Sequence, residues 1–290
     1  MVENKGYIRT DLASEMRETK GLGEHSGIDY REENVNGFEF QYMEIKNEEG
    51  ARVLGKDIGR YITAHTGRVW LMSENEKENA VQALAKDIAS FMPKAESVLT
   101  IGLGNREITA DALGPKTVDG LLVTRHVKQY KPELFESIGQ KEMAALCPGV
   151  VGQTGIETFE LVEGAVKKVK PDLVIVIDAL AARSVDRLAA TVQISDTGIA
   201  PGSGIGNKRV KIDSMSLGVP VIAVGVPTVV DSATLVYDAL ERADMGECAG
   251  MLEGVLENSR SFFVSLKESD IAVNESARLL ADAINLAFRI

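Results

Sequence analysis

The stretch VLTIGLGNREITADALGP (residues 98–115) starts as an apolar run, breaks at Gly102 and Gly104, and brings Asp111 to a predicted helix start. A buried strand that ends in glycines and leads into a helix is how open α/β sheets build their sites. The stretch therefore predicts an α/β fold with a site loop after this strand, formed by Gly102, Gly104 and Asn105.

The flanking sequence supplies further strands and helices. Apolar or alternating runs predict strands over residues 38–45, 59–65, 172–177, 191–194 and 219–225. Amphipathic periodicity predicts helices over residues 73–92, 112–122, 184–190, 232–256 and 274–290. The run over residues 172–177 is continuously apolar, which is typical of a parallel strand buried on both faces. The alternation of strands and helices predicts one α/β domain with a mostly parallel sheet flanked by helices.

Composition excludes several classes of function. The net charge of −11 argues against direct nucleic-acid binding. Apolar runs are too short to cross a membrane, and the N-terminus lacks the apolar region of a secretory signal, so we expect a cytoplasmic protein. The 3 histidines are scattered and the 2 cysteines read as buried thiols. We therefore expect no metal site and no cofactor.

Asp111 and Asp178 stand in matching settings. Each follows an apolar strand and each is followed by Ala-Leu. Because parallel strands end at the same edge of a sheet, the two carboxylates are expected to converge across a crevice. Two carboxylates that close share a proton, since one pKa rises and the other falls, and such a pair can activate water and protonate a leaving amine. The alternative is that each aspartate only caps a helix or forms a turn.

Other motifs in the same region are weaker. The sequence GLGNRE has Glu107 where a dinucleotide-binding fingerprint needs its third glycine. The triplet from Asp196 to Gly198 is similar to the pepsin motif, but it occurs once and in a glycine-rich loop over residues 196–209. Asp196 and Gly198 therefore belong to a loop that either forms part of the site or is structural.

Four segments together resemble the germination protease family of spore-forming bacteria: IRTDLASE, GLGNREITADALGP, VIVIDALAAR and ISDTGIAPGSGIGNKR. The resemblance implies an atypical aspartic endopeptidase with a fold similar to hydrogenase-maturation proteases and with Asp111 and Asp178 as the catalytic pair. It also implies small acid-soluble spore proteins as substrates, a homotetramer, and a location in the forespore or spore core. Ala110 stands where the family pattern leads us to expect proline.

The resemblance further implies a zymogen that processes itself. Residues 10–15, TDLASE, look like a substrate site cut after an acidic residue. Asp11–Leu12 is then the cleaved bond, residues 1–11 the propeptide, and residues 12–290 a single protease domain. Asp11 also suits the N-cap of a helix over residues 12–17; the cleavage site is the favoured interpretation, and both roles are compatible.

Several points stay open at this level. A metal-dependent peptidase of the hydrogenase-maturation type and a non-catalytic nucleotide- or peptide-binding module are the alternatives. The sequence does not assign base and acid between the two aspartates. Charge complementarity nominates basic residues to read the acidic residue before the cleaved bond. The candidates are Arg106, Arg125, Arg183 and Lys208.

Overall fold

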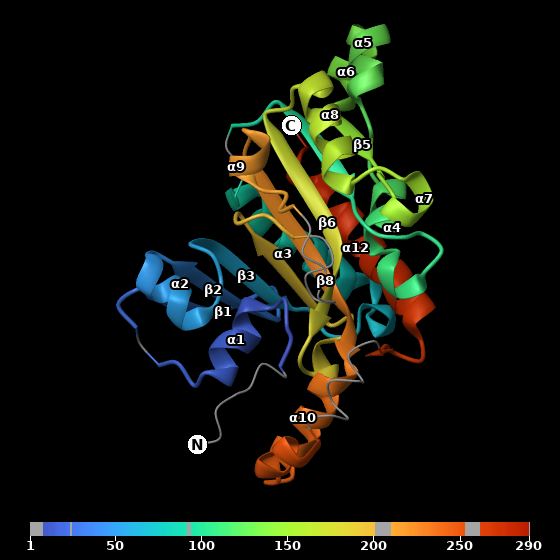
Figure 1. Cartoon of the computed structure of the whole chain (residues 1–290). Coiled ribbons are helices and arrows are strands. Elements are labelled where there is room, and N and C mark those ends of the chain that lie inside the picture. The colour runs from blue at the N-terminus through green and yellow to red at the C-terminus, as the bar shows by residue number, and fades with distance from the viewer. Residues whose placement is uncertain (1–7, 24, 92–93, 201–209, 253–261, 290) are drawn as a thin grey trace.

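The computed structural model describes residues 8–23, 25–91, 94–200, 210–252 and 262–289, and a nine-stranded sheet runs through its centre (Figure 1). The strands are β1 (Ile28–Val35), β2 (Phe38–Ile45), β3 (Gly59–His65), β4 (Ser97–Gly102), β5 (Glu142–Leu146), β6 (Leu173–Ala182), β7 (Thr191–Ser195), β8 (Val221–Asp231) and β9 (Phe263–Val264). The α-helices are α1 (Ala13–Thr19), α2 (Glu48–Leu54), α3 (Glu74–Phe91), α4 (Leu113–Asp119), α5 (Arg125–Tyr130), α6 (Pro132–Ile138), α7 (Val151–Thr154), α8 (Thr158–Val169), α9 (Ser214–Leu217), α10 (Ser232–Arg242) and α12 (Ser269–Ala287). Short 3₁₀ helices are η1 (Val69–Leu71), η2 (Thr109–Asp111), η3 (Val185–Arg187) and η5 (Gly246–Leu252).

The sheet has the strand order β1-β2-β3-β7-β8-β6-β4-β5, with β9 paired to β8. The predicted α/β class is confirmed, with helices on both faces of the sheet. Parallel pairing is confined to β5, β4, β6 and β8, and the other pairs are antiparallel. The sheet therefore contains more antiparallel pairing than predicted. At one end the Asn36-Gly37 turn accounts for this, because both residues have positive φ (53° and 93°) and close a tight hairpin between β1 and β2.

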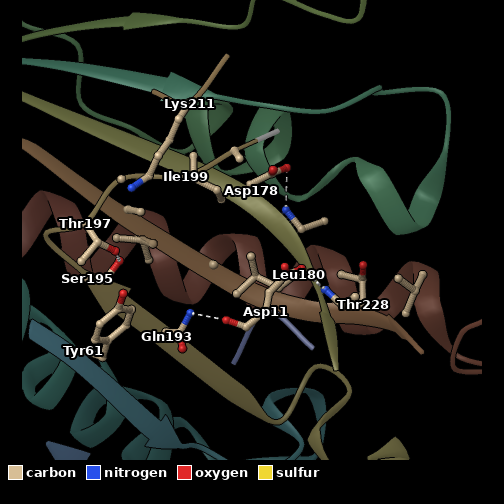
Figure 2. A pocket seen from close by; sticks show the side chains of 18 of the residues that line it. Asp11, Tyr61, Asp178, Leu180, Gln193, Ser195, Thr197, Ile199, Lys211 and Thr228 are labelled. Carbon is tan, nitrogen blue, oxygen red and sulfur yellow. Dashed lines mark hydrogen bonds between the residues drawn. The ribbon is translucent and has the colours of Figure 1, made fainter. Parts of the chain in front are cut away.

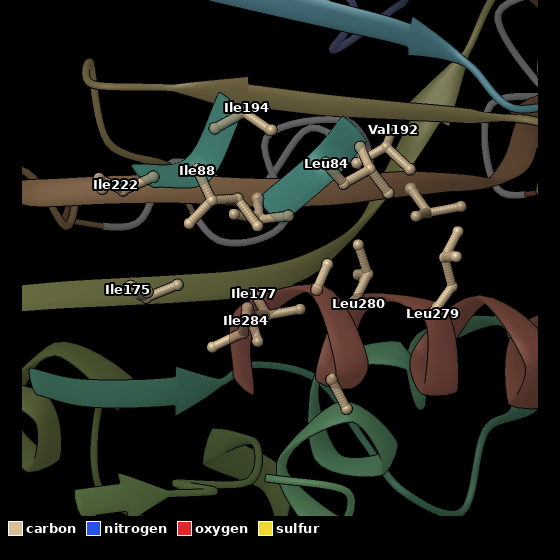
Figure 3. Packing of buried hydrophobic residues seen from close by; sticks show 14 of the residues in the cluster. Leu84, Ile88, Ile175, Ile177, Val192, Ile194, Ile222, Leu279, Leu280 and Ile284 are labelled. Carbon is tan, nitrogen blue, oxygen red and sulfur yellow. The ribbon is translucent and has the colours of Figure 1, made fainter. Parts of the chain in front are cut away.

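Helices α3 and α12 pack together on one face of the sheet and form the main core with it (Figure 3). The core residues include Leu84 and Ile88 of α3, Leu280 and Ile284 of α12, and Ile175, Ile177, Val192, Ile194 and Ile222 of the sheet. Helix α8 covers the opposite face, where Val162 and Val166 pack against Val174 and Val176 of β6. Helices α1 and α2 cover that same face at its antiparallel end, against Met43 and Ile45 of β2.

Two strands are longer than predicted. β6 continues to Ala182 and β8 to Asp231, so Asp178 lies inside a strand rather than after its end. Proline in a central strand is normally restricted to bulges, and the register shifts beside Leu180, the partner of Pro227. The bulge therefore lets the pair of strands run past the point where β4 stops.

Most helix predictions are confirmed in place but differ in length. The segment expected over residues 184–190 forms the 3₁₀ helix η3, and the one expected over residues 232–256 forms α10 and η5, with residues 253–256 outside the described residues. The helix expected over residues 73–92 is α3, and the Ser73 hydroxyl and the Glu76 carboxylate form the capping box that opens it. The one expected over residues 112–122 splits into η2 and α4. No helix among the described residues is long and apolar enough to cross a membrane.

Candidate active site

Asp178 belongs to a row of residues that crosses three neighbouring strands. It is paired in register with Gly225 of β8, which is paired in turn with Gln193 of β7. Alternate residues of a strand share a face, so Asp178 is on the same face as Val174 and Val176, the face that α8 covers further along. At a strand spacing of about 4.8 Å, the Cα atoms of Gln193 and Asp178 are about 10 Å apart. The Leu180 side chain covers the sheet surface between them, because a Cβ on Gly225 would lie 2.6 Å from the Leu180 Cγ.

Asp111 is held in place by the turn that follows β4. The Asn105 N–H donates to the Asp111 Oδ2 at 2.7 Å, and the Thr228 hydroxyl donates to the Ala110 carbonyl at 2.6 Å. Gly104 has a φ of +109°, and a Cβ at this position would lie 1.9 Å from the Asp111 carbonyl oxygen. The turn therefore needs glycine at position 104 in order to fold back on Asp111.

Close backbone packing brings this turn to Asp178. The Leu103 N–H donates to the Ile177 carbonyl at 2.8 Å, one residue before Asp178. A Cβ on Gly114 would lie 2.7 Å from the same carbonyl oxygen, and one on Gly102 would lie 2.4 Å from the Gly114 carbonyl. These glycines allow α4 to sit against β4 and β6, so the Asp111 turn lies beside the middle of β6.

Asp111 and Asp178 line one cavity of about 540 Å³. Figure 2 shows Asp178 among the side chains that line it. The same cavity is lined by Asp11, the residue before the predicted self-cleavage bond. Its other walls come from the α2–β3 turn, β7, β8 and the loop after β7 and are largely uncharged, with Lys56, Asp57 and Lys211 as the remaining charged residues. The two predicted aspartates thus line the same cavity, while their catalytic role stays a prediction.

The backbone of Asp11 is fixed on both sides. Its N–H donates to the Ala181 carbonyl at 2.9 Å, and its Oδ2 accepts from the Ala181 N–H at 2.8 Å. Its carbonyl oxygen accepts from the Lys56 Nζ at 2.9 Å and from the Gln193 Nε2 at 3.1 Å, the latter drawn in Figure 2. Asp11 therefore does not cap α1, whose N-cap residue is Leu12.

The residues after Asp11 are anchored as firmly. Leu12 is fully buried and packs in a cluster with Leu180. The Glu15 carboxylate is 2% exposed and accepts from the Arg183 N–H at 2.7 Å and the Ser184 N–H at 2.9 Å. Burial raises the pKa of Glu15, and these hydrogen bonds oppose the rise. The predicted cleavage segment is thus bound along the last residues of β6.

Lys56 is a site residue that the sequence analysis missed. It follows α2 and reaches the cavity from a segment distant in sequence from Asp11. Burial lowers the pKa of Lys56, while the carboxylates of Asp11, Glu15 and Asp57 act in the opposite direction. No motif marks Lys56 among the 32 Lys and Arg residues of the chain, and only the packing of α2 beside α1 reveals it.

The basic residues nominated from the sequence serve other contacts. Arg106 pairs with Asp119, Arg125 with Glu142, and Arg183 with Asp238 and Glu241. Lys208 lies outside the described residues, as do the other residues of the 201–209 segment.

The predicted site loops divide into two groups. Gly198 lines the cavity, whereas Asp196 accepts from the Arg60 N–H at 2.7 Å and pairs with its guanidinium. Gly102, Gly104 and Asn105 lie behind Asp111 and shape its turn, as described above. Across the described residues, no three or more His, Cys, Asp or Glu side chains are grouped so that they could hold a metal ion.

Comparison with known proteins places this geometry in a family. Residues 2–243 match the family model described as germination protease. The germination protease of Caldanaerobacter subterraneus subsp. tengcongensis is 41% identical, over 97% of this chain and 94% of that protein. A Clostridium perfringens germination protease is 38% identical, over 97% of this chain and 95% of that protein. A [NiFe] hydrogenase maturation protease from Thermococcus kodakarensis aligns at 17% identity with a TM-score of 0.33, over 59% of this chain and 99% of that one.

Proposed function

Because the chain belongs to the germination protease family and is therefore a peptidase, we propose that it is an aspartic-type endopeptidase with Asp111 and Asp178 as its catalytic pair. We propose also that it is made as a zymogen that cuts its own Asp11–Leu12 bond. This cut separates a propeptide, residues 1–11, from the protease domain, residues 12–290.

One observation carries the proposal. Asp111, Asp178 and Asp11 reach the wall of a single cavity from three distant parts of the chain. The residue pair nominated for catalysis and the residue nominated for cleavage are therefore neighbours in space. A helix-capping or turn-forming role for each aspartate alone gives no reason for this meeting.

The chemistry follows from two carboxylates that share one proton in a mostly uncharged cavity. The ionised carboxylate takes a proton from water as the water oxygen attacks the carbonyl carbon of Asp11. The protonated carboxyl group gives its proton to the nitrogen of Leu12 as the peptide bond breaks. The pair is then ready for the next cycle with its proton on the other member.

The natural substrates that we propose are small acid-soluble spore proteins, cut after an acidic residue during germination in the spore core. The family name of the relatives supports the germination role, and the TDLASE segment supports the preference for an acidic residue. We propose a homotetramer as the working assembly, on the family resemblance alone.

Asparagine substitutions test the catalytic pair. Asp111→Asn and Asp178→Asn each remove a proton-transfer group, so each is expected to lower self-processing and peptide cleavage by at least about 10³-fold. Release of residues 1–11 is followed by mass spectrometry, and thermal unfolding verifies the fold. Asp119→Asn, which removes an exposed carboxylate outside the cavity, is the control. Wild-type processing by either cavity variant would reject the proposal.

The pH and metal dependence of processing give a second test. A pair that works with one proton is expected to process at a rate that changes between about pH 5 and 8, with gain on the acid side. A flat profile contradicts the shared proton. Inhibition by a chelator with rescue by a divalent cation would instead favour the metal-dependent peptidase.

A further inference from the structure

We propose that Lys56 and Gln193 are catalytic residues that hold the carbonyl oxygen of the acidic residue before the cleaved bond, both in self-processing and in substrate cleavage. This inference rests on the proposed function, because it assigns the electrophilic side of the same reaction. It replaces the arginine candidates nominated from the sequence with residues that touch the bond itself.

The contacts at Asp11 are those of a site that polarises a carbonyl group. The Lys56 Nζ and the Gln193 Nε2 converge on the Asp11 oxygen at 2.9 and 3.1 Å. Donors at these distances are suited to stabilise negative charge that develops on the oxygen. In addition, the Gln193 Oε1 accepts from the Ala13 N–H at 2.7 Å, so its amide group spans the bond between Asp11 and Leu12.

The sheet places Gln193 on the same face as Asp178. The two residues are the ends of the row whose centre is Gly225, and the Leu180 side chain lies over that glycine. Leu180 packs in turn against Leu12, the residue after the carbonyl that Gln193 holds. The carbonyl oxygen faces Lys56 and Gln193, and Asp111 and Asp178 line the same cavity.

The reaction step balances with these groups. The water oxygen bonds to the carbonyl carbon and loses its proton to one carboxylate, while the carbonyl π electrons move to the oxygen between Lys56 and Gln193. When the C–N bond breaks, the electrons return and the Leu12 nitrogen takes the proton of the other carboxyl group. Lys56 and Gln193 supply hydrogen bonds and charge throughout and exchange no atoms.

The same contacts suit a substrate chain bound in place of residues 10–15. The contacts of Lys56 and Gln193 are to main-chain atoms, which every peptide offers. The Ala181 N–H donates to the Asp11 carboxylate, and any acidic side chain at this position offers the same acceptor. The ammonium group of Lys56 adds positive charge close to this carboxylate.

Two substitutions test the proposal. Lys56→Met removes the ammonium group and keeps the length of the stem, and Gln193→Glu keeps the acceptor for Ala13 but removes the donor to Asp11. Each is expected to lower the self-processing rate by about 10²–10³-fold, the usual loss for one oxyanion donor. On an acidic peptide added to processed enzyme, the loss is expected in kcat with KM nearly unchanged. Lys141→Met is the matched control, since its Nζ also donates to a main-chain carbonyl, that of Ala95, away from the cavity.

Two pH profiles separate catalysis from mere docking of the propeptide. Gln193→Glu is expected to regain part of its rate at acid pH, where the protonated carboxyl group can donate again. Lys56→Arg is expected to extend activity to higher pH, because arginine stays charged where a lysine of lowered pKa does not. The charged groups that face Lys56 are the carboxylates of Asp11, Glu15 and Asp57.

The outcomes are distinct. If wild type processes itself but Lys56→Met and Gln193→Glu match its rate and its kcat, this inference is wrong and the aspartate pair stands. If Asp178→Asn also processes normally, the proposed function is wrong as well. If Lys56→Met fails to unfold cooperatively, the rate of Gln193→Glu and the two pH profiles carry the test.

Discussion

Two cavities lie along the same N-terminal segment, and they use charge in opposite ways. The first, described above, has Lys56 on the carbonyl of Asp11 within mostly uncharged walls. The second, of about 450 Å³, is lined by Glu15, Glu18, His65, Asp186 and Asp238 together with Arg183, Arg187 and Arg242. Here the arginines pair with carboxylates of the cavity and its rim.

The difference between the two cavities indicates which of them can recognise the charge of a substrate. An arginine that already pairs with carboxylates has little left to offer a ligand, and its removal takes an ion-pair partner from those carboxylates. A lysine that donates to a peptide carbonyl is instead placed for a bond that changes during the reaction. We therefore expect substitutions in the second cavity to affect stability, and those in the first to affect rate.

The largest effect expected beyond the two proposals is at Arg183. Arg183→Met removes a guanidinium that is 16% exposed and lies 2.9 Å from Asp238 and in contact with Glu241. Because Arg242 still pairs with Asp238, we expect a loss of about 3 kcal/mol in the free energy of unfolding, at the lower end for a broken buried ion pair. Urea titration measures it.

In contrast to its effect on stability, Arg183→Met is expected to leave activity nearly unchanged. Peptide cleavage by Arg183→Met, measured below its unfolding temperature, is expected within about twofold of wild type, since surrounding contacts and not the reacting bond are lost. A large fall in kcat at full folding would show that the second cavity takes part in the reaction.

A smaller effect, on rate, is expected at the wall of the first cavity. Gly104→Ala places a methyl group 1.9 Å from the Asp111 carbonyl oxygen at a φ of +109°, so the turn must move and Asp111 with it. A shift of about 1 Å in a catalytic group costs about 10²-fold in kcat. The matched control is Gly67→Ala at the second cavity, where φ is +70° but no atom lies within 4 Å of the new Cβ. It is expected to lose about 1 kcal/mol of stability and no rate. Equal rates for both variants would contradict the account of the turn.

Local sequence signals predicted much of the frame that holds these cavities. The Ser73–Glu76 capping box marked the start of α3, and the apolar runs marked β4 and the first half of β6. The Asn36-Gly37 hairpin was not predicted, because the polar residues of β1, most of whose side chains face solvent, hid the first strand. The end of β6 was misplaced since Asp178 interrupts the apolar run, and pairing with a bulged β8 overrides that interruption.

The site residues also divide into those that local sequence patterns mark and those that they do not. Asp111 and Asp178 could be nominated because each follows an apolar run of the sequence, a local pattern. Lys56 and Gln193 could not, because nothing near either residue differs from an ordinary surface lysine or strand glutamine. Their role depends on contacts with Asp11 across 45 and 182 residues of chain, which only the folded structure supplies.

The smallest effect is a pH dependence of stability from the second cavity. Burial lowers the pKa of His65 to about 4, with the adjacent Arg187 acting in the same direction and Glu32 against it. The unfolded chain, with a histidine pKa of about 6.5, therefore binds a proton that the folded chain refuses as the pH falls. The contribution of a neutral His65 is complete above about pH 6.5 and is lost between there and about pH 4. Glutamine cannot be protonated in this range. Between pH 7.5 and 4.5, the free energy of unfolding of His65→Gln, measured by urea titration, is therefore expected to fall by about 2 kcal/mol less than that of wild type. If the two proteins lose stability in parallel as the pH falls, His65 accepts its proton in the folded state. That result would contradict the purely structural role argued here for the second cavity.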